Sequence, residues 1–300
     1  MPLSQVADFA GETTWSTRTC DCGKALGYTI AGLIWQYSVG GECRWNPDSE
    51  ENSMPVRQSI DEGIAKVVID SPPVNALTVG DVWEIDRIFA AISEDPDVRV
   101  VILTAVGKGF NGGADIKEMQ SVPGFEFSLG SGAACFAAFD RIYRTPVPVI
   151  AAVNGFCMGL GVGLVGSCDY LITSTTARFA LPEVDRGALG CASHLAKLVP
   201  PMRLRQMMLT CEPVTAQELY AWGSVYRMVE PDELAASAQE AAEAIAKKRP
   251  RVVRAAKAAL NAIDSYPLAH NYRLEQGFTY ELNLHGDGDA ARDEFVAKKT

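Results

Sequence analysis

Residues of two kinds, an acidic residue and repeated glycines, suggest chemistry along one stretch of the chain, residues 146–184. Glu183 follows Pro182 after an apolar run, and burial in such a setting raises the pKa of a carboxyl and prepares it for proton transfer. Glycines recur at 159, 161 and 163 after a strand-like run, and a second glycine-rich turn, residues 107–113, follows another. Two such turns can aim two backbone N–H groups at one point, which is the geometry of an oxyanion hole. We therefore expect the active site here.

The glycine turns also admit other interpretations. Gly107-x-Gly109-x-x-Gly112 and Gly161-x-Gly163-x-x-Gly166 both match the dinucleotide-binding fingerprint. However, no acidic residue ends a second strand about 20 residues after the first match, and the second match begins past the end of its strand. A nicotinamide or flavin site and simple tight packing turns stay open as alternatives. No G-x-x-x-x-G-K-[ST] segment is present, which argues against a Walker-type nucleotide site.

The elements that must position these residues alternate between strands and helices. Apolar runs predict strands, and 3.6-residue periodicity with Thr, Pro and Gly boundary signals predicts helices. Helices dominate the last third of the chain, so the class is α/β with a helical C-terminal part. The predicted strands are 64–69, 98–106, 146–153 and 170–174, and the clearest predicted helices are 79–93, 133–143, a short one within 214–223, 231–249 and one that ends near Ile263.

Residues 1–53 differ from the rest because they show no sustained periodicity. They contain Cys20, Cys22 and Cys43, but neither a fourth ligand nor a nearby histidine, so we expect no metal site. Nor does the start resemble a signal peptide. We expect a poorly ordered or non-native extension at 1–53, with Met54 as a candidate natural start, then a core at 54–245 and a helical region at 246–300.

The composition excludes several function classes. The net charge of −10 argues against nucleic acid as a partner, because phosphate binding needs clustered Lys and Arg. No apolar run reaches the roughly 18 to 20 residues of a membrane span, so no membrane association is expected. Cysteines such as Cys135, Cys157 and Cys168 sit inside apolar runs, which is typical of reduced thiols in a cytoplasmic protein.

Three segments resemble the signature segments of the crotonase (enoyl-CoA hydratase/isomerase) superfamily: GKGFNGGADIKEM, PVIAAVNGFCMGLGVGL and FALPEV. The resemblance implies the crotonase fold of repeated ββα units, with a C-terminal helical region used in trimerisation. It implies an acyl-CoA substrate, no cofactor beyond that coenzyme A, and a homotrimer or a dimer of trimers. It also implies an oxyanion hole formed by the backbone N–H groups of Ala114 and Leu160.

The resemblance further implies which carboxylates act. Hydratases of this family generally use two glutamates; Glu183 matches the second, whereas Gly163 stands at the first. Asp185 would face the same way as Glu183 if the segment stays extended, and His194 begins a predicted helix, so either could be a recruited helper. Their structural interpretations, a surface or helix-end charge and a packed or capping histidine, are the more common roles of such residues.

Further segments, including GLVG, RGALG, EQGFT and ELNL, are similar to a branch of the family that opens a ring of a steroid-derived bicyclic CoA thioester. That branch also lacks the first glutamate. The resemblance implies hydrolytic ring opening with Glu183 as general base, and we expect Gly163 to leave room for the ring. An ordinary 2-enoyl-CoA hydratase or isomerase, and a non-catalytic CoA-binding scaffold, are the alternatives.

Coenzyme A contacts are also implied by the resemblance. Backbone contacts are expected from one segment before the first helix and from the first glycine turn, while the basic run KKRPRVVRAAK could meet the phosphates or form a solvated helix face. The aromatics Phe125, Phe127, Phe136 and Phe139 are candidates for lining the acyl pocket or for core packing. The expected coenzyme A contacts are Val74, Asn75, Ala76, Leu77, Gly112, Gly113, Ala114 and Ile116.

Overall fold

The computed structural model describes residues 28–30, 33–35, 54–121, 125–264 and 266–297. The chain divides into two compact units, Met1–Met54 and Pro55–Thr300. In the first, strands β1 (Tyr28–Ile30) and β2 (Leu33–Trp35) pair antiparallel. The three cysteines weighed above as metal ligands, Cys20, Cys22 and Cys43, lie outside the described residues. The second unit contains the described residues from Pro55 onward.

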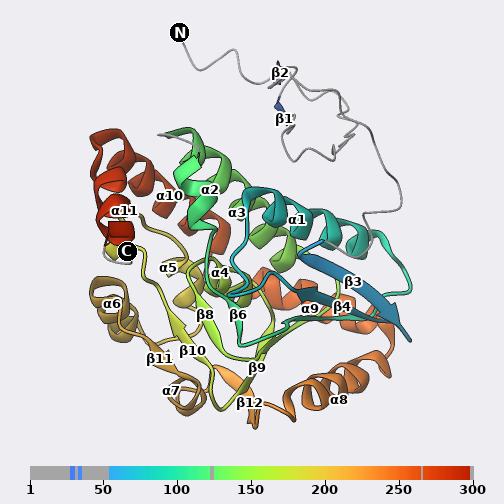
Figure 1. Cartoon of the computed structure of the whole chain (residues 1–300). Helices are drawn as coiled ribbons and strands as arrows, with labels where there is room; N and C mark the ends of the chain where they lie inside the picture. Colours follow the sequence, from blue (N-terminus) through green and yellow to red (C-terminus); the bar gives the residue numbers. More distant parts are fainter. Residues whose placement is uncertain (1–27, 31–32, 36–53, 122–124, 265, 298–300) are drawn as a thin grey trace. The chain divides into compact units, whose positions relative to one another are not determined.

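A six-stranded sheet forms the centre of this unit, in the order β12-β9-β7-β5-β4-β3 (Figure 1). All neighbours run parallel except β3 and β4, an antiparallel hairpin. Its two-residue turn, Glu62–Gly63, has positive φ at both positions, as the twist of a tight hairpin favours. The strands are β3 (Val56–Asp61), β4 (Ile64–Ile69), β5 (Val100–Ala105), β7 (Val149–Val153), β9 (Tyr170–Ser174) and β12 (Val225–Val229).

A second sheet of four short strands has the order β11-β10-β8-β6. Three long strands of the first sheet, β5, β7 and β9, are each followed by one of these short strands and then by a helical segment. This repetition confirms the predicted α/β class with ββα units. It also delivers the ends of β6, β8 and β10 to one region, where the candidate site lies. The short strands are β6 (Gly109–Asn111), β8 (Phe156–Met158), β10 (Arg178–Ala180) and β11 (Val214–Thr215).

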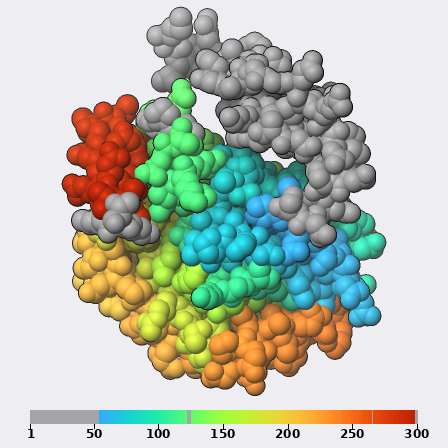
Figure 2. Space-filling view, in the orientation of Figure 1, coloured from blue at the N-terminus to red at the C-terminus, as the bar shows by residue number. Residues whose placement is uncertain are grey.

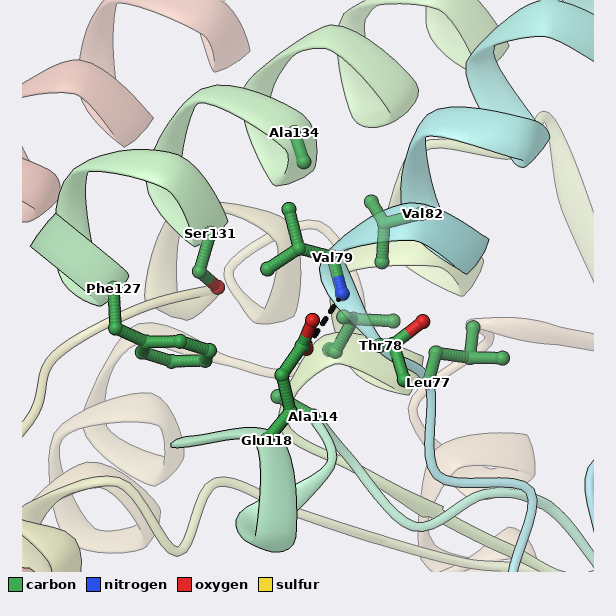
Figure 3. Close-up of a pocket in the computed structure, with 10 residues that line it drawn as sticks. Leu77, Thr78, Val79, Val82, Ala114, Glu118, Phe127, Ser131 and Ala134 are labelled. Carbon is green, nitrogen blue, oxygen red and sulfur yellow. Dashed lines mark hydrogen bonds between the residues drawn. The ribbon is translucent and has the colours of Figure 1, made fainter. Parts of the chain in front are cut away.

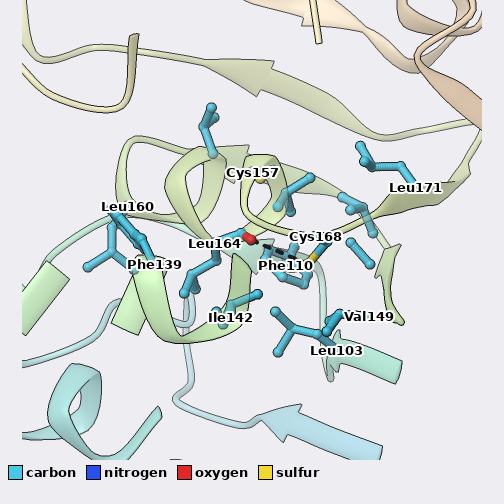
Figure 4. Packing of buried hydrophobic residues seen from close by; sticks show 14 of the residues in the cluster. Leu103, Phe110, Phe139, Ile142, Val149, Cys157, Leu160, Leu164, Cys168 and Leu171 are labelled. Carbon is cyan, nitrogen blue, oxygen red and sulfur yellow. Dashed lines mark hydrogen bonds between the residues drawn. The ribbon is translucent and has the colours of Figure 1, made fainter. Parts of the chain in front are cut away.

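The two faces of the large sheet bury different helices. Along β5, Val101 and Leu103 join the main core with α1 and α3, whereas Val100 and Ile102 join a second cluster with α8. This alternation follows from the two-residue period of a strand, and both faces are covered, as is usual for parallel sheets. Figure 4 shows part of the main core. The helices concerned are α1 (Val79–Glu94), α3 (Phe125–Arg144) and α8 (Leu234–Ala246).

The predicted elements are largely present. The helix predicted at 79–93 is α1, and a capping box fixes its start: Thr78 accepts from the Asp81 N–H, and the Asp81 carboxylate accepts from the Thr78 N–H. The helix predicted at 133–143 is longer, because α3 begins at Phe125. The remaining helices are α2 (Ile116–Ser121), α4 (Leu160–Gly166), η3 (Val184–Arg186), α5 (Ala192–Leu195), α6 (Pro201–Thr210), α7 (Ala216–Ala221), α9 (Pro250–Ile263), α10 (Leu268–His285) and α11 (Asp287–Ala297).

Helix α9 turns its polar side inward. Its one buried residue, Lys257, places Nζ 2.6 Å from Oδ2 of Asp169, which also accepts the Val149 N–H. On the outer side Leu260 and Ile263 are 60% and 76% exposed. An amphipathic helix with its apolar side in solvent is the reverse of the usual arrangement in a monomer.

The last helices lie close to the segment that carries Glu183. Helix α10 packs on α3 and α5, and α11 packs on η3. Figure 2 shows the C-terminal residues, in red, at the surface beside the green α2 and the yellow-orange α6. Within the described parts of the chain, no helix combines the length and the apolar character that crossing a membrane requires.

Candidate active site

The first N–H donor lies in the turn after β6. There the chain runs beside the segment before α1: the Gly112 N–H donates to the Val74 carbonyl at 2.9 Å and the Leu77 N–H to the Gly113 carbonyl at 3.1 Å. A Cβ on Gly112 would lie 2.9 Å from the Val74 oxygen, so only glycine permits this approach. The structure therefore brings together the two segments expected to contact coenzyme A. Ala114 lies at their junction.

Asn75 supports this arrangement from within. It is buried with φ 54°, and its Nδ2 donates to the carbonyls of Val106 and Gly109, both at 2.8 Å. Its Oδ1 accepts the Ser71 N–H, and its own carbonyl accepts from Asn111. Its backbone N–H donates to the Ser71 carbonyl at 2.7 Å, so both the side chain and the backbone of Asn75 hold the turn.

The second donor is the N–H of Leu160, the first residue of α4. Gly159, before it, has φ 51° and its N–H donates to the Ala180 carbonyl at 3.0 Å. Both Ala114 and Leu160 line one narrow cavity. Neither of their N–H groups donates to an acceptor within the described residues. Two unused N–H groups at one cavity are what an oxyanion hole requires.

The rest of this cavity is apolar with one acidic group (Figure 3). Phe127 and Ser131 reach it from α3, so one of the four predicted aromatic lining residues is present. Glu118, from α2, accepts the Val79 N–H on Oε2 at 2.8 Å, and burial raises its pKa. This bond ties α2, and with it the Ala114 turn, to the start of α1.

Glu183 approaches the second donor. It follows β10 through Leu181 and Pro182 and caps η3, and its Oε1 lies so close to Gly159 that a Cβ there would overlap it. Oε2 is shielded from solvent and has no hydrogen-bond partner. Burial raises the pKa of Glu183 to about 8; its own backbone N–H and Arg186 oppose the shift, and Glu275 adds to it. A carboxyl that titrates near neutral pH suits proton transfer.

The position of the missing hydratase glutamate is filled. A Cβ on Gly163 would overlap the ring of Phe139 and would lie 2.8 Å from Sγ of Cys191. The expectation that Gly163 leaves room for a ring is therefore wrong: side chains from α3 and from the start of α5 occupy that space. Gly163 permits the close packing of α4 against Phe139 instead.

Neither candidate helper lies beside Glu183 as expected. Asp185 belongs to a 3-10 helix, so the extended segment assumed for it is absent; the side chain is exposed and lies beside the Cys211 thiol. His194 is buried against the rings of Phe139 and Tyr272, with centroids 4.7 and 5.0 Å away. Burial lowers its pKa to about 3, so the imidazole is neutral. Phe139 separates His194 from Gly163.

A second narrow cavity, of about 10 Å³, lies at this aromatic group. His194, Tyr272, Phe136 and Phe139 line it. Phe136 and Phe139, predicted for the acyl pocket, thus face a different cavity from the one that holds the two N–H donors. The fourth aromatic, Phe125, packs edge-on against Tyr280 of α10 with centroids 5.5 Å apart.

Helix α10 positions the segment that follows Glu183, and sequence patterns did not reveal this. Glu275 accepts the N–H groups of Ala192 and Ser193 at 2.8 and 2.5 Å, and burial raises its pKa to about 7. The Leu189 N–H donates to Oγ1 of Thr279 at 2.9 Å. Both residues belong to the EQGFT segment noted above, whose one-turn spacing on a helix could have indicated a common face.

Part of the basic run that we expected near the coenzyme A phosphates makes contacts within the protein instead. Lys257 is buried in its ion pair with Asp169, and Arg254 donates to the carbonyls of Asp95 and Val98. Only the start of the run, Lys247 to Arg251, is exposed for a ligand.

Comparisons with known proteins agree with this geometry. A model of the family described as enoyl-CoA hydratase/isomerase matches residues 59–300. The chain is 49% identical over 235 residues to a (7aS)-7a-methyl-1,5-dioxo-2,3,5,6,7,7a-hexahydro-1H-indene-carboxyl-CoA hydrolase of Rhodococcus jostii (strain RHA1), covering 78% of this chain and 91% of that protein. It is 48% identical to a protein of the same description from Mycobacterium tuberculosis, covering 82% of this chain and all of the relative.

More distant relatives catalyse other reactions on the same scaffold. A carnitinyl-CoA dehydratase of Salmonella enteritidis PT4 is 33% identical over 79% of this chain and 92% of its own length. Among solved structures, an enoyl-CoA hydratase/isomerase from Xanthobacter autotrophicus Py2 superposes with a TM-score of 0.73 at 26% identity, covering 82% of this chain and 98% of that one. The resemblance read from the motifs is confirmed.

Proposed function

The chain belongs to the enoyl-CoA hydratase/isomerase family, and we propose that it opens a ring of a bicyclic, steroid-derived acyl-CoA by adding water to a ring ketone. The carrying observation is Glu183, whose Oε2 is buried without a partner and whose Oε1 lies at Gly159, directly before the Leu160 donor, with Phe139 and Cys191 in place of a hydratase's other glutamate. Two relatives at 48–49% identity, named as hydrolases of a dioxo-hexahydroindene-carboxyl-CoA, support the choice of substrate.

The residues fit such a reaction as follows. Water adds to the ketone carbon as the Glu183 carboxylate takes its proton, and the resulting alkoxide collapses with cleavage of the adjacent ring C–C bond. The electron pair passes into the conjugated thioester, whose oxygen accepts the N–H groups of Ala114 and Leu160 as an enolate. Glu183 then returns its proton to carbon. The ketone has become a carboxylic acid, and the thioester is intact.

The geometry favours this reaction over the alternatives. A hydratase that had recruited a second acid–base group would need it next to Glu183, but Asp185 is exposed and His194 lies behind Phe139. A non-catalytic scaffold would have no use for a buried carboxyl oxygen without a partner, which destabilises the fold.

Two assays test the proposal together. The purified protein is incubated with a bicyclic ring-ketone CoA thioester, the product is weighed by mass spectrometry, and free thiol is measured with a chromogenic disulfide. Ring opening adds one water and releases no coenzyme A, whereas thioester hydrolysis releases it. Rapid hydration of crotonyl-CoA with no reaction of the bicyclic substrate would refute the proposal and favour a hydratase.

We further propose that the protein forms a homotrimer, or a dimer of trimers, through the outer face of α9. Val252, Leu260 and Ile263 present a contiguous apolar stripe that is more than half exposed, while the inner face is fixed by Lys257. A closed symmetric assembly would cover such a stripe. Light scattering on a sizing column tests this: Ile263→Asp should lower the mass to that of one chain, and an unchanged mass would exclude this face.

A cytosolic location is proposed as well. Four free cysteines, Cys135, Cys157, Cys168 and Cys191, are buried as thiols, as expected of a protein from a reducing compartment.

A further inference from the structure

Arg186 lies next to the oxyanion turn, one helical turn after Glu183. Its Nη1 is 3.9 Å from the point that a Cβ on Gly113 would occupy, and Gly113 immediately precedes Ala114. Glu183 is placed in the corresponding way at Gly159, which precedes Leu160. The short η3 segment therefore sets a carboxyl against one donor loop and a guanidinium against the other.

The guanidinium lowers the pKa of Glu183 but forms no ion pair with it. No carboxylate of the described residues forms an ion pair with Arg186, and its Nε is buried without a hydrogen-bond partner. What holds the side chain is a ring: its Cζ lies 4.6 Å from the centroid of Phe295 in α11. Half-buried arginines are usually paired, so an unpaired one beside a candidate active site indicates a ligand with negative charge.

We propose that Arg186 binds the carboxylate that forms from the ring ketone, a role that rests on the ring-opening function proposed above. In that reaction the oxygen of water and the oxygen of the ketone both become part of one carboxyl group. The electron pair of the broken C–C bond stays with the carbon that leaves the former ketone carbon. The new carboxylic acid then loses its proton to solvent. A neutral acyl group thereby gains a full negative charge, in or beside a cavity whose other walls are mostly apolar.

The shape of the guanidinium favours this oxygen pair over the thioester oxygen. The thioester oxygen already has two donors, from Ala114 and Leu160, which match its two lone pairs. A planar fork of N–H groups matches a carboxylate with two parallel hydrogen bonds, and the unpartnered Nε supplies one side of that fork. The coenzyme A phosphates are a second possible source of anionic oxygen, and the test separates the two.

The test measures equilibrium binding of three compounds to the wild type, Arg186→Met and Arg186→Lys. The compounds are the ring-opened carboxylate CoA thioester, cyclohexanecarboxyl-CoA, which has no carboxylate, and free coenzyme A. Arg227→Met serves as the matched control, because Arg227 also stacks on an aromatic ring, that of Tyr226, but lies outside the site. Thermal unfolding confirms that each variant is folded.

We expect Arg186→Met to weaken binding of the ring-opened thioester at least tenfold and to change the other two dissociation constants less than twofold. Arg186→Lys should recover part of the loss, since it keeps the charge without the fork. Equal weakening for all three compounds would assign Arg186 to coenzyme A and overturn the inference, as would no change at all. Absence of ring opening by the wild type would instead refute the proposed function, and this is measured separately.

Discussion

Replacing Glu183 with glutamine should distinguish two effects of its carboxyl group: its contribution to turnover, and the loss in free energy of unfolding that its burial causes. In the folded protein its pKa is about 8, against 4.5 for an unperturbed glutamate. Between these values the unfolded chain has released the proton while the folded chain keeps it, so stability falls as pH rises. At pH 7 the difference spans about 2.5 pH units at roughly 1.4 kcal/mol each, which is on the order of 3 kcal/mol.

Glu183→Gln removes this penalty because glutamine does not ionise. We expect the variant to be more stable than the wild type by about 3 kcal/mol at pH 7, and by only about 1 kcal/mol at pH 5, which lies only half a unit above the pKa of 4.5 in the unfolded chain. In thermal unfolding at pH 7 the gain corresponds to roughly 6–12 °C for a unit of this size. Turnover of the bicyclic substrate should fall by at least about 10²-fold.

The measurement is thermal and urea unfolding of both proteins at equal concentration at pH 5 and pH 7, because assembly makes stability depend on concentration. Glu281→Gln is the matched control, since Glu281 is exposed on α10. It should leave the pH dependence unchanged. A stability difference between Glu183→Gln and the wild type that is the same at both pH values would refute the reasoning, even if activity were lost.

Three further outcomes are expected. In the proposed mechanism the base form of Glu183 starts the reaction, so kcat/KM for ring opening should rise with pH up to about 8 and level off above it; a decline through pH 8 would show that the protonated form acts first. Gly163→Ala should lower the free energy of unfolding by about 1–3 kcal/mol, because its methyl group overlaps Phe139, whereas Gly277→Ala, with open space around it, should not. Lys257→Met should cost about 3–5 kcal/mol in urea unfolding, since it leaves Asp169 without its cation; a loss no larger than that of the exposed Lys248→Met would contradict this.

Local signals were enough to predict the strands and glycine turns on which the site is built. Apolar runs followed by glycines indicated strand and turn, and the resemblance to the crotonase superfamily selected Ala114 and Leu160 as the donors, which the structure places at one cavity. Close backbone approach needs glycine whatever the tertiary context, as at Gly112 against the Val74 carbonyl. Such requirements are written into the sequence near the residues that they position.

The environment of Glu183 could not be predicted in the same way. Phe139 and Cys191 fill the space at Gly163 from positions more than twenty residues away on either side, and Glu275 reaches the loop from α10. A missing side chain looks like free space in a sequence, whereas a close-packed interior fills it from its neighbours. The prediction that Asp185 faces the same way as Glu183 was wrong for a local reason. The chain after Pro182 forms a 3-10 helix instead of staying extended, and this changes its direction.

The same contacts explain why one carboxyl can serve this site. Burial and Glu275 raise the pKa of Glu183, while Arg186 lowers it, so the balance falls near neutral pH and about a tenth of the protein carries the base form at pH 7. A resting carboxyl that is mostly neutral lets an apolar ring system enter without meeting a buried charge. Charge then develops on the substrate, next to two unused N–H groups and an unpaired guanidinium. Glu183 and Arg186, whose charges influence each other before the substrate binds, are therefore placed to act on the same substrate once it carries the negative charge.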